Sequence, residues 1–267
     1  MKIVTDLSVM SRPLRVGQGF SPNALFDAMD AGLWFDPSDR LSLFRDTAGT
    51  IPVSAVGQAV ARINDKTGNG VHATQPISAA RPIYRLDSGG RAYLEFDGVD
   101  DFLATATLVP GSAEMQLIAG VRKLATAGYQ TLCELSGDAG SFPGTLSMLA
   151  TSPGDGNLGY IFSQGTIGQA ALAAHPPGAN SVLTGLGDIG GDQLVLRIDG
   201  SQVAQTSGDQ GSGTYQPYPV YIGMRAGNSI PFNGRLYGLV LRFGSGLSAA
   251  DLAQVETFMG KKTGMTL

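Results

Sequence analysis

One short stretch, residues 93–103, constrains the fold more than any other part of the chain. It reads YLEFDGVDDFL. Leu94 and Phe96 would fall on one side of an extended strand, with Glu95 on the other. Asp97-Gly98 then supplies a turn, because glycine adopts positive φ at little cost and Asp can hydrogen-bond to its own backbone. The extended pattern resumes after the turn, so the stretch predicts a β-hairpin.

The same strand-and-turn pattern extends over most of the chain. The 38 Gly and 14 Pro are scattered without a period, as in many short strands joined by turns. Residues 194–206 (LVLRIDGSQVAQT) give the strongest hairpin signal, and residues 235–243 are apolar on both faces, which predicts a central strand. Further strands are expected at residues 115–121, 131–135, 145–149, 158–162 and 220–224.

Two helix starts interrupt the β pattern. Ser21-Pro22 combines an N-cap serine with a proline at the first helical position, and a short helix is expected from there to Gly32. Ser248 followed by Asp251 resembles a capping box, and Leu252, Val255 and Phe258 would form one apolar stripe. A C-terminal helix is therefore expected as well.

Charge and hydropathy exclude several classes of protein. The chain has 18 basic and 22 acidic residues without a basic run, which argues against binding to nucleic acid. No apolar run approaches the ~20 residues of a membrane span, and residues 1–17 lack the apolar core of a signal peptide. Cys133 is the single cysteine, so an internal disulfide is excluded and a small buried residue is its expected role.

A family resemblance rests on two parts of the chain. Residues 34–103 contain WFDPSD, DKTGNGVHATQ and FDGVDDFL, and residues 221–263 contain PFNGRLYGLVL followed by GLS. These segments resemble the concanavalin A-like lectin/glucanase (laminin-G-like) jelly-roll domains found in structural proteins of tailed bacteriophages and prophages. The resemblance implies an all-β antiparallel jelly-roll sandwich over residues 21–267, with a short N-terminal helix, a C-terminal helix and an N-terminal arm at residues 1–20.

The resemblance also implies a function. The expected protein is a virion structural or accessory protein, assembled in the host cytoplasm and displayed on the tail, baseplate or capsid surface. It would be homo-oligomeric and attach to other virion proteins through residues 1–20, because these residues lack the pattern of an independent core. Weak binding to a neutral host polysaccharide is expected too, since acidic glycans would be repelled by the net charge of −4. The alternatives are a glycan-active enzyme or a cell-surface lectin of the same fold.

Glycoside hydrolysis finds no support in the acidic residues. Hydrolysis needs two carboxylates placed across the sugar, and the family's catalytic strand presents Glu-x-Asp-x-x-Glu. The chain has only four glutamates, and none has this spacing: Glu95, Glu114, Glu134 and Glu256. The expectation is therefore a protein without catalytic residues.

Two candidate binding sites remain. Asp97, Asp100 and Asp101 form the densest acidic cluster and could hold Ca²⁺ at the rim of the sandwich. Further oxygen ligands could come from Asp65, Asn69 and Asn233, but only if the fold brings them near. The three aspartates of the cluster could equally serve turn hydrogen bonds.

The second candidate site is a polar, glycine-rich loop at residues 206–215. Tyr215 and Tyr218 could stack on a sugar while Asp209 and Gln210 bind its hydroxyl groups. Tyr129 and Tyr160 are further aromatic residues near loops, and core packing would explain any one of these tyrosines equally well. No other cofactor is expected.

Overall fold

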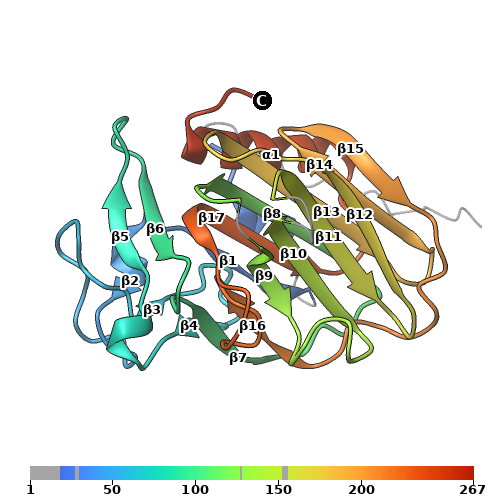
Figure 1. The fold of residues 1–267 in the computed structure, drawn as a ribbon, viewed down its shortest axis with the longest axis horizontal. Coiled ribbons are helices and arrows are strands. Elements are labelled where there is room, and N and C mark those ends of the chain that lie inside the picture. The colour runs from blue at the N-terminus through green and yellow to red at the C-terminus, as the bar shows by residue number, and fades with distance from the viewer. Residues whose placement is uncertain (1–18, 28–29, 127, 152–155) are drawn as a thin grey trace, which may run out of the picture.

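Two antiparallel β-sheets packed face to face form the body of the molecule (Figure 1). The structure, a computed structural model, describes residues 19–27, 30–126, 128–151 and 156–267. The expected arm at residues 1–20 therefore lies almost entirely outside the described residues. The antiparallel β-sandwich with a C-terminal helix, predicted from the sequence, is confirmed.

The eight-stranded sheet contains both the strongest hairpin and the predicted central strand. In spatial order its strands are β15 (Ser201–Thr206), β14 (Gln193–Ile198), β13 (Asn180–Asp188), β8 (Glu114–Lys123), β17 (Asn233–Phe243), β6 (Ala92–Asp97) and β5 (Ile83–Leu86), and β1 (Ala31–Phe35) also pairs with β17. The β14–β15 turn places Asp199 and Gly200 at positive φ (52° and 78°), the geometry of a tight two-residue hairpin turn. Both predictions are confirmed.

The nine-stranded sheet forms the other half of the sandwich. Its strands in spatial order are β12 (Gly168–Ala174), β11 (Leu158–Gln164), β10 (Thr145–Thr151), β9 (Gln130–Leu135), β16 (Tyr218–Ile222), β7 (Leu103–Leu108), β4 (Ala73–Thr74), β3 (Arg62–Ile63) and β2 (Leu43–Phe44). Between the sheets lies one continuous apolar core, which includes Leu94, Phe96, Leu196, Leu239 and Leu241 as expected.

The connection between β6 and β7 differs from the sequence prediction. These strands do not pair with each other: β6 pairs with β17 and β5, while β7 pairs with β16 and β4 in the opposite sheet. The Asp97-Gly98 turn is present, with Gly98 at φ 78°, but the chain crosses from one sheet to the other after it. The hairpin prediction is wrong, because the chain forms an arch between the two sheets. Leu94 and Phe96 enter the core from the eight-stranded sheet, and Leu103 enters it from the nine-stranded sheet.

The C-terminal helix α1 (Ala249–Thr263) covers the outer face of the eight-stranded sheet (Figure 1). The Ser248 hydroxyl accepts a hydrogen bond from the Asp251 amide at 3.1 Å and donates one to the Asp251 carboxylate at 2.7 Å, so the predicted capping box is confirmed. On the buried side, Val255 and Met259 pack against Val182 and Val240.

The N-terminal helix is shorter than expected. It is one 3₁₀ turn, η1 (Pro22–Leu25), which ends at Phe26 in extended conformation. Ser21 makes no side-chain cap bond, so the helix lacks the stabilisation that the Ser-Pro signal implied. Two further 3₁₀ turns, η2 (Arg40–Ser42) and η3 (Ser78–Ala80), lie in the connections before and after the short strands β2–β4.

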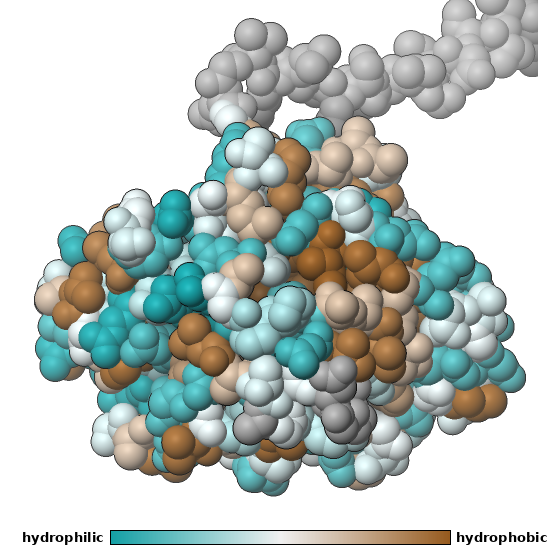
Figure 2. Space-filling view, turned by 45° about the horizontal axis from the view of Figure 1, so that its top comes forward, coloured by the Kyte–Doolittle hydropathy of each residue, from teal (hydrophilic) through white to brown (hydrophobic). Residues whose placement is uncertain are grey.

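The surface in Figure 2 is a mosaic of polar and apolar residues with one larger apolar patch. Within the described residues, none of the helices is long and apolar enough to span a membrane.

Candidate functional site

The loop expected to bind sugar is fixed mainly by its own buried side chains. Tyr215 is 1% exposed, packs against the ring of Phe243 and shares a 2.7 Å hydrogen bond with the Ser163 hydroxyl. Gln210 is also buried, and its amide donates to the carbonyls of Asp188 and Gln193 at 3.0 and 3.2 Å. Neither side chain can contact a sugar. The prediction that Tyr215 stacks on a sugar beside Tyr218, with Gln210 binding its hydroxyl groups, is therefore wrong. Tyr215 and Gln210 are buried and anchor the loop.

The other two residues of this prediction remain at the surface. Tyr218 is partly exposed, and its hydroxyl donates to the Pro143 carbonyl at 3.3 Å. Asp209 is exposed and accepts a 2.7 Å hydrogen bond from the Gly211 amide. Only the Tyr218 ring and the Asp209 carboxylate of the four predicted residues can therefore reach a sugar, so this surface offers fewer contacts to a sugar than the sequence suggested.

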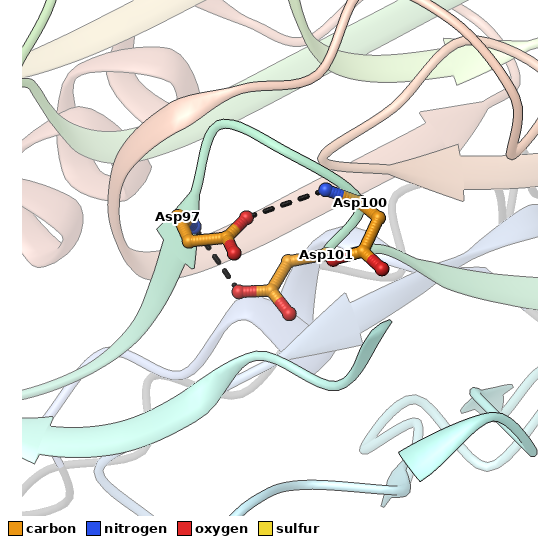
Figure 3. A group of neighbouring side chains, drawn as sticks. All are labelled: Asp97, Asp100 and Asp101. Carbon is orange, nitrogen blue, oxygen red and sulfur yellow. Dashed lines mark hydrogen bonds between the residues drawn. The ribbon is translucent and has the colours of Figure 1, made fainter. Parts of the chain in front are cut away.

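The fold brings the three predicted metal ligands together. Oxygen atoms of Asp97, Asp100 and Asp101 all lie within 4.8 Å of one another (Figure 3). The Asp97 amide donates to the Asp101 carboxylate at 3.1 Å, and the Asp97 carboxylate accepts from the amides of Val99 and Asp100 at 2.8 and 3.4 Å. Burial, followed by the neighbouring charge of Asp97, raises the pKa of Asp101 to about 7. Both a cation and a set of turn hydrogen bonds fit this arrangement.

Asn233 lies beside the acidic cluster, opposite Asp97 in the β6–β17 register. A Cβ atom on Gly98 would lie 2.7 Å from the Asn233 Cβ, which shows how closely the two segments approach. The side-chain amide oxygen of Asn233 could therefore join the three aspartates as a ligand of a hard cation.

We predict that Ca²⁺ raises the melting temperature and that excess chelator lowers it again. A ligand that binds only the folded state stabilises that state, by about 2.7 kcal/mol at a hundred times its dissociation constant. The measurement is thermal unfolding in Ca²⁺ and in chelator, with Asp101→Asn as the variant that should respond to neither. An identical melting curve for the parent protein in both buffers would leave the three aspartates as turn and cap residues.

A second surface lies on the outer face of the nine-stranded sheet and includes Tyr160, which the sequence had offered as a further aromatic candidate. Tyr160 and Phe162 alternate with the buried Ile161 on β11, so both rings point away from the core. The rings lie nearly parallel, at 5° with 6.4 Å between centroids. Leu172, opposite Tyr160 on β12, is 47% exposed and extends the apolar surface. We call Tyr160, Phe162 and Leu172 the aromatic face.

A buried ion pair lies beside the aromatic face. Glu134 of β9 accepts a 2.8 Å hydrogen bond from Arg225, which follows β16, and the Glu134 side chain is fully buried. Burial raises the pKa of Glu134, and the hydrogen bond and charge of Arg225 oppose this effect. Ser147, opposite Glu134 on β10, is also buried. Neither its hydroxyl nor the Glu134 Oε1 atom has a partner at good hydrogen-bond geometry in the described part of the chain.

Electrostatic coupling connects this ion pair to the aromatic face. Burial raises the pKa of Tyr160; the nearby Tyr129 raises it further, and the Arg225 charge lowers it. Tyr129 is 41% exposed, so it adds a second accessible tyrosine to the edge of the face. Aromatic rings beside polar groups can stack on the apolar side of a sugar and hydrogen-bond to its hydroxyls. The alternation of residues 158–164 was the sequence signal, but its outward side was not identifiable before the sheet was known.

Glu134 is a buried carboxylate paired with an arginine. Its pKa depends mainly on burial, Arg225 and Ser147, and no second carboxylate is among the groups that affect it most in the described residues. Hydrolysis by the common mechanism requires such a partner.

Comparison with known proteins identifies the fold class. No family model and no curated protein sequence matches the chain. Among solved structures, domain 4 of AbnA, a GH43 extracellular arabinanase from Geobacillus stearothermophilus solved with arabinotriose, is 14% identical with a TM-score of 0.58, covering 85% of this chain and 98% of that one.

The binding domain of botulinum neurotoxin DC, solved with rat synaptotagmin II, is also similar. It is 10% identical with a TM-score of 0.56 over 86% of this chain, and the chain spans about half (51%) of its length. At these identities the similarity establishes a shared β-sandwich fold.

Proposed function

We propose that this chain is a non-catalytic glycan-binding domain and that it binds sugar through the aromatic face. The observation that carries the proposal is the stacked, outward-pointing pair Tyr160 and Phe162 on β11. Rings held in place by a rigid strand lose little conformational entropy when a sugar binds to them. Arg225, next to the rings and 24% exposed, provides a polar group for orientation, and the buried Glu134 holds it in place.

The structural relatives support binding of this kind. The AbnA domain was solved with arabinotriose. A structure of botulinum neurotoxin type C, with a TM-score of 0.55, is described together with the finding that cell entry of this toxin depends on interaction with two ganglioside molecules. Several proteins with this fold therefore bind saccharides, and the aromatic face is where the present chain has the side chains for it.

The biological setting of this proposal is a bacteriophage particle. Its support is the sequence resemblance of residues 34–103 and 221–263 to phage jelly-roll proteins. On this hypothesis residues 1–20 attach the domain to other virion proteins, and the domain is displayed on the tail, baseplate or capsid surface. Display in many copies, including as a homo-oligomer, would multiply a weak affinity for a neutral host polysaccharide without any new contact. A glycan-active enzyme or a cell-surface lectin remains the alternative.

We predict that Tyr160→Ala weakens glycan binding by about fivefold or more. The loss of one stacking ring costs on the order of 1 kcal/mol, and the neighbouring Phe162 loses its stacking partner as well. The measurement is a glycan array probed with a multivalent form, followed by calorimetry on the best ligand. Tyr218→Ala is the matched control, because it removes a partly exposed tyrosine from the other candidate surface.

Three outcomes are informative. Retained binding in Tyr218→Ala with loss in Tyr160→Ala supports the aromatic face. The reverse pattern would move the site to the loop containing Asp209. Failure of the parent protein to bind any neutral or acidic glycan on the array would contradict the proposal and leave a purely structural role.

A further inference from the structure

A pair of arginines lies on the opposite side of the sandwich from the aromatic face. Arg122 of β8 and Arg235 of β17 are directly opposed in the antiparallel register. Both point to the outer face of the eight-stranded sheet, because Val121 and Leu236, their sequence neighbours, are in the core between the sheets. Both side chains are partly exposed. We call these two residues the arginine pair.

No carboxylate lies within ion-pair distance of either arginine among the described residues. The seven ion pairs of this part of the chain use other arginines and lysines. Glu95, opposite Arg235 on β6, is bound by Arg85 at 3.2 Å. The Nε atoms of Arg122 and Arg235 are buried without a hydrogen-bond partner. Two arginines thus lie directly opposite each other on neighbouring strands, and neither has a carboxylate within ion-pair distance in the described part of the chain, although the whole chain has a net charge of −4.

This arrangement is costly by itself, since like charges directly opposite on neighbouring strands destabilise a sheet. The surroundings nevertheless hold one of the charges in place. The Arg235 guanidinium lies 4.7 Å from the centroid of the Tyr93 ring, which in turn packs against Tyr237. Burial acts to lower the pKa of Arg235, but the Tyr237 hydroxyl together with the charges of the tyrosines and Glu95 outweighs it and raises this pKa, which favours the charged form. Arg235 is therefore fixed, charged and partly open to solvent.

We propose that the arginine pair binds an oxyanion, the group shared by carboxylate, sulfate and phosphate. One oxyanion between two guanidinium groups removes their mutual repulsion and accepts charge-assisted hydrogen bonds from both, which arginine forms with this geometry better than lysine. The site is separate from the aromatic face, on the other sheet, and does not depend on the proposed function. A ligand with both a neutral sugar surface and an acidic group could be held by different faces of one domain.

The test is calorimetric titration of the purified full chain with sodium sulfate, sodium phosphate and sodium glucuronate, at constant ionic strength maintained with chloride. We expect saturable binding of at least one of the three. Arg122→Gln and Arg235→Gln should each weaken it by about tenfold, the effect of losing one charge-assisted hydrogen bond. Preference for glucuronate would identify a carboxylate ligand, and preference for sulfate or phosphate a mineral or esterified oxyanion.

Two controls make the test specific. Arg45→Gln removes an exposed positive charge next to β2, in the opposite sheet, and should change the affinity by less than about twofold. Tyr160→Ala should leave oxyanion binding unchanged even if glycan binding is lost. Absence of saturable binding by all three anions, or equal binding by the parent and both arginine variants, would overturn the proposal, and unchanged melting curves for these variants would show that folding is not the cause.

Discussion

Replacing Phe96 by alanine should lower the free energy of unfolding by about 3–5 kcal/mol, the cost of a large cavity in a packed core. Phe96 is 1% exposed and packs on Phe232 with 5.9 Å between ring centroids. The neighbouring backbone is already close, since a Cβ atom on Gly223 would lie 2.3 Å from the Phe96 ring. Chemical denaturation followed by fluorescence or circular dichroism measures this difference.

Val99→Ala is the matched control for this cavity. Val99 is on the same turn but 71% exposed, so its truncation should cost no more than about 0.5 kcal/mol. Leu196→Ala, on the β14 side of the same core, should cost about 2–5 kcal/mol. If Phe96→Ala and Val99→Ala prove equally stable, the proposed core between the sheets is wrong.

Removal of Arg225 should have the second large effect. Arg225→Ala leaves the fully buried Glu134 without its ion-pair partner, and the expected cost is roughly 3 kcal/mol, near the lower end for a buried pair because the Arg225 side chain is 24% exposed. Glu134→Gln in the same background removes the uncompensated charge and should recover part of the loss. The double-mutant cycle, measured by denaturation, gives the coupling between the two residues.

The effect of Arg225→Ala should also depend on pH. In the native protein burial already raises the pKa of Glu134 above its ordinary value of 4.5, and loss of Arg225 raises it further. The folded state then binds the Glu134 proton more tightly than the unfolded state does. The contribution of this proton to the free energy of unfolding is therefore fully present below pH 4.5 and is lost as the pH rises through the folded-state pKa. The variant should therefore be most destabilised at neutral and higher pH. The exposed pair of Arg85 and Glu95 provides the control: Arg85→Ala should cost less than about 1 kcal/mol and show little of this pH dependence.

Much of the fold is encoded in short segments of the sequence. The Asp-Gly turn of β14–β15, the apolar β17 and the Ser248 capping box of α1 all depend on neighbouring residues. Several strands without a strong local pattern were not expected, among them β12 and β13. β12 consists mainly of small residues, and β13 is interrupted by Gly185 and Gly187, where a Cβ atom would meet Ile161 or Tyr215 at 2.7 Å or less. These glycines are needed by packing partners that are distant in sequence.

The candidate sites show the same difference between features set by neighbouring residues and features set by residues distant in sequence. The acidic cluster of Asp97, Asp100 and Asp101 was predictable, because these residues are adjacent in the chain and share one turn. The burial of Tyr215 was not predictable, since it depends on Ser163 and Phe243, which lie in strands distant in sequence. The aromatic face and the arginine pair likewise exist only through cross-strand register.

The sequence by itself determined where the strongly patterned strands, several turns and the capped helix occur, because periodicity and turn chemistry are properties of neighbouring residues. It could not determine which sheet each strand joins. Residues 93–103 illustrate the difference: both extended halves and the turn at Gly98 are present, yet β6 and β7 lie in opposite sheets. Only the tertiary structure decided this, because each strand has one partner, β17 for β6 and β16 for β7, that comes more than a hundred residues later. Burying Phe96 and Leu103 in one core favours the arch.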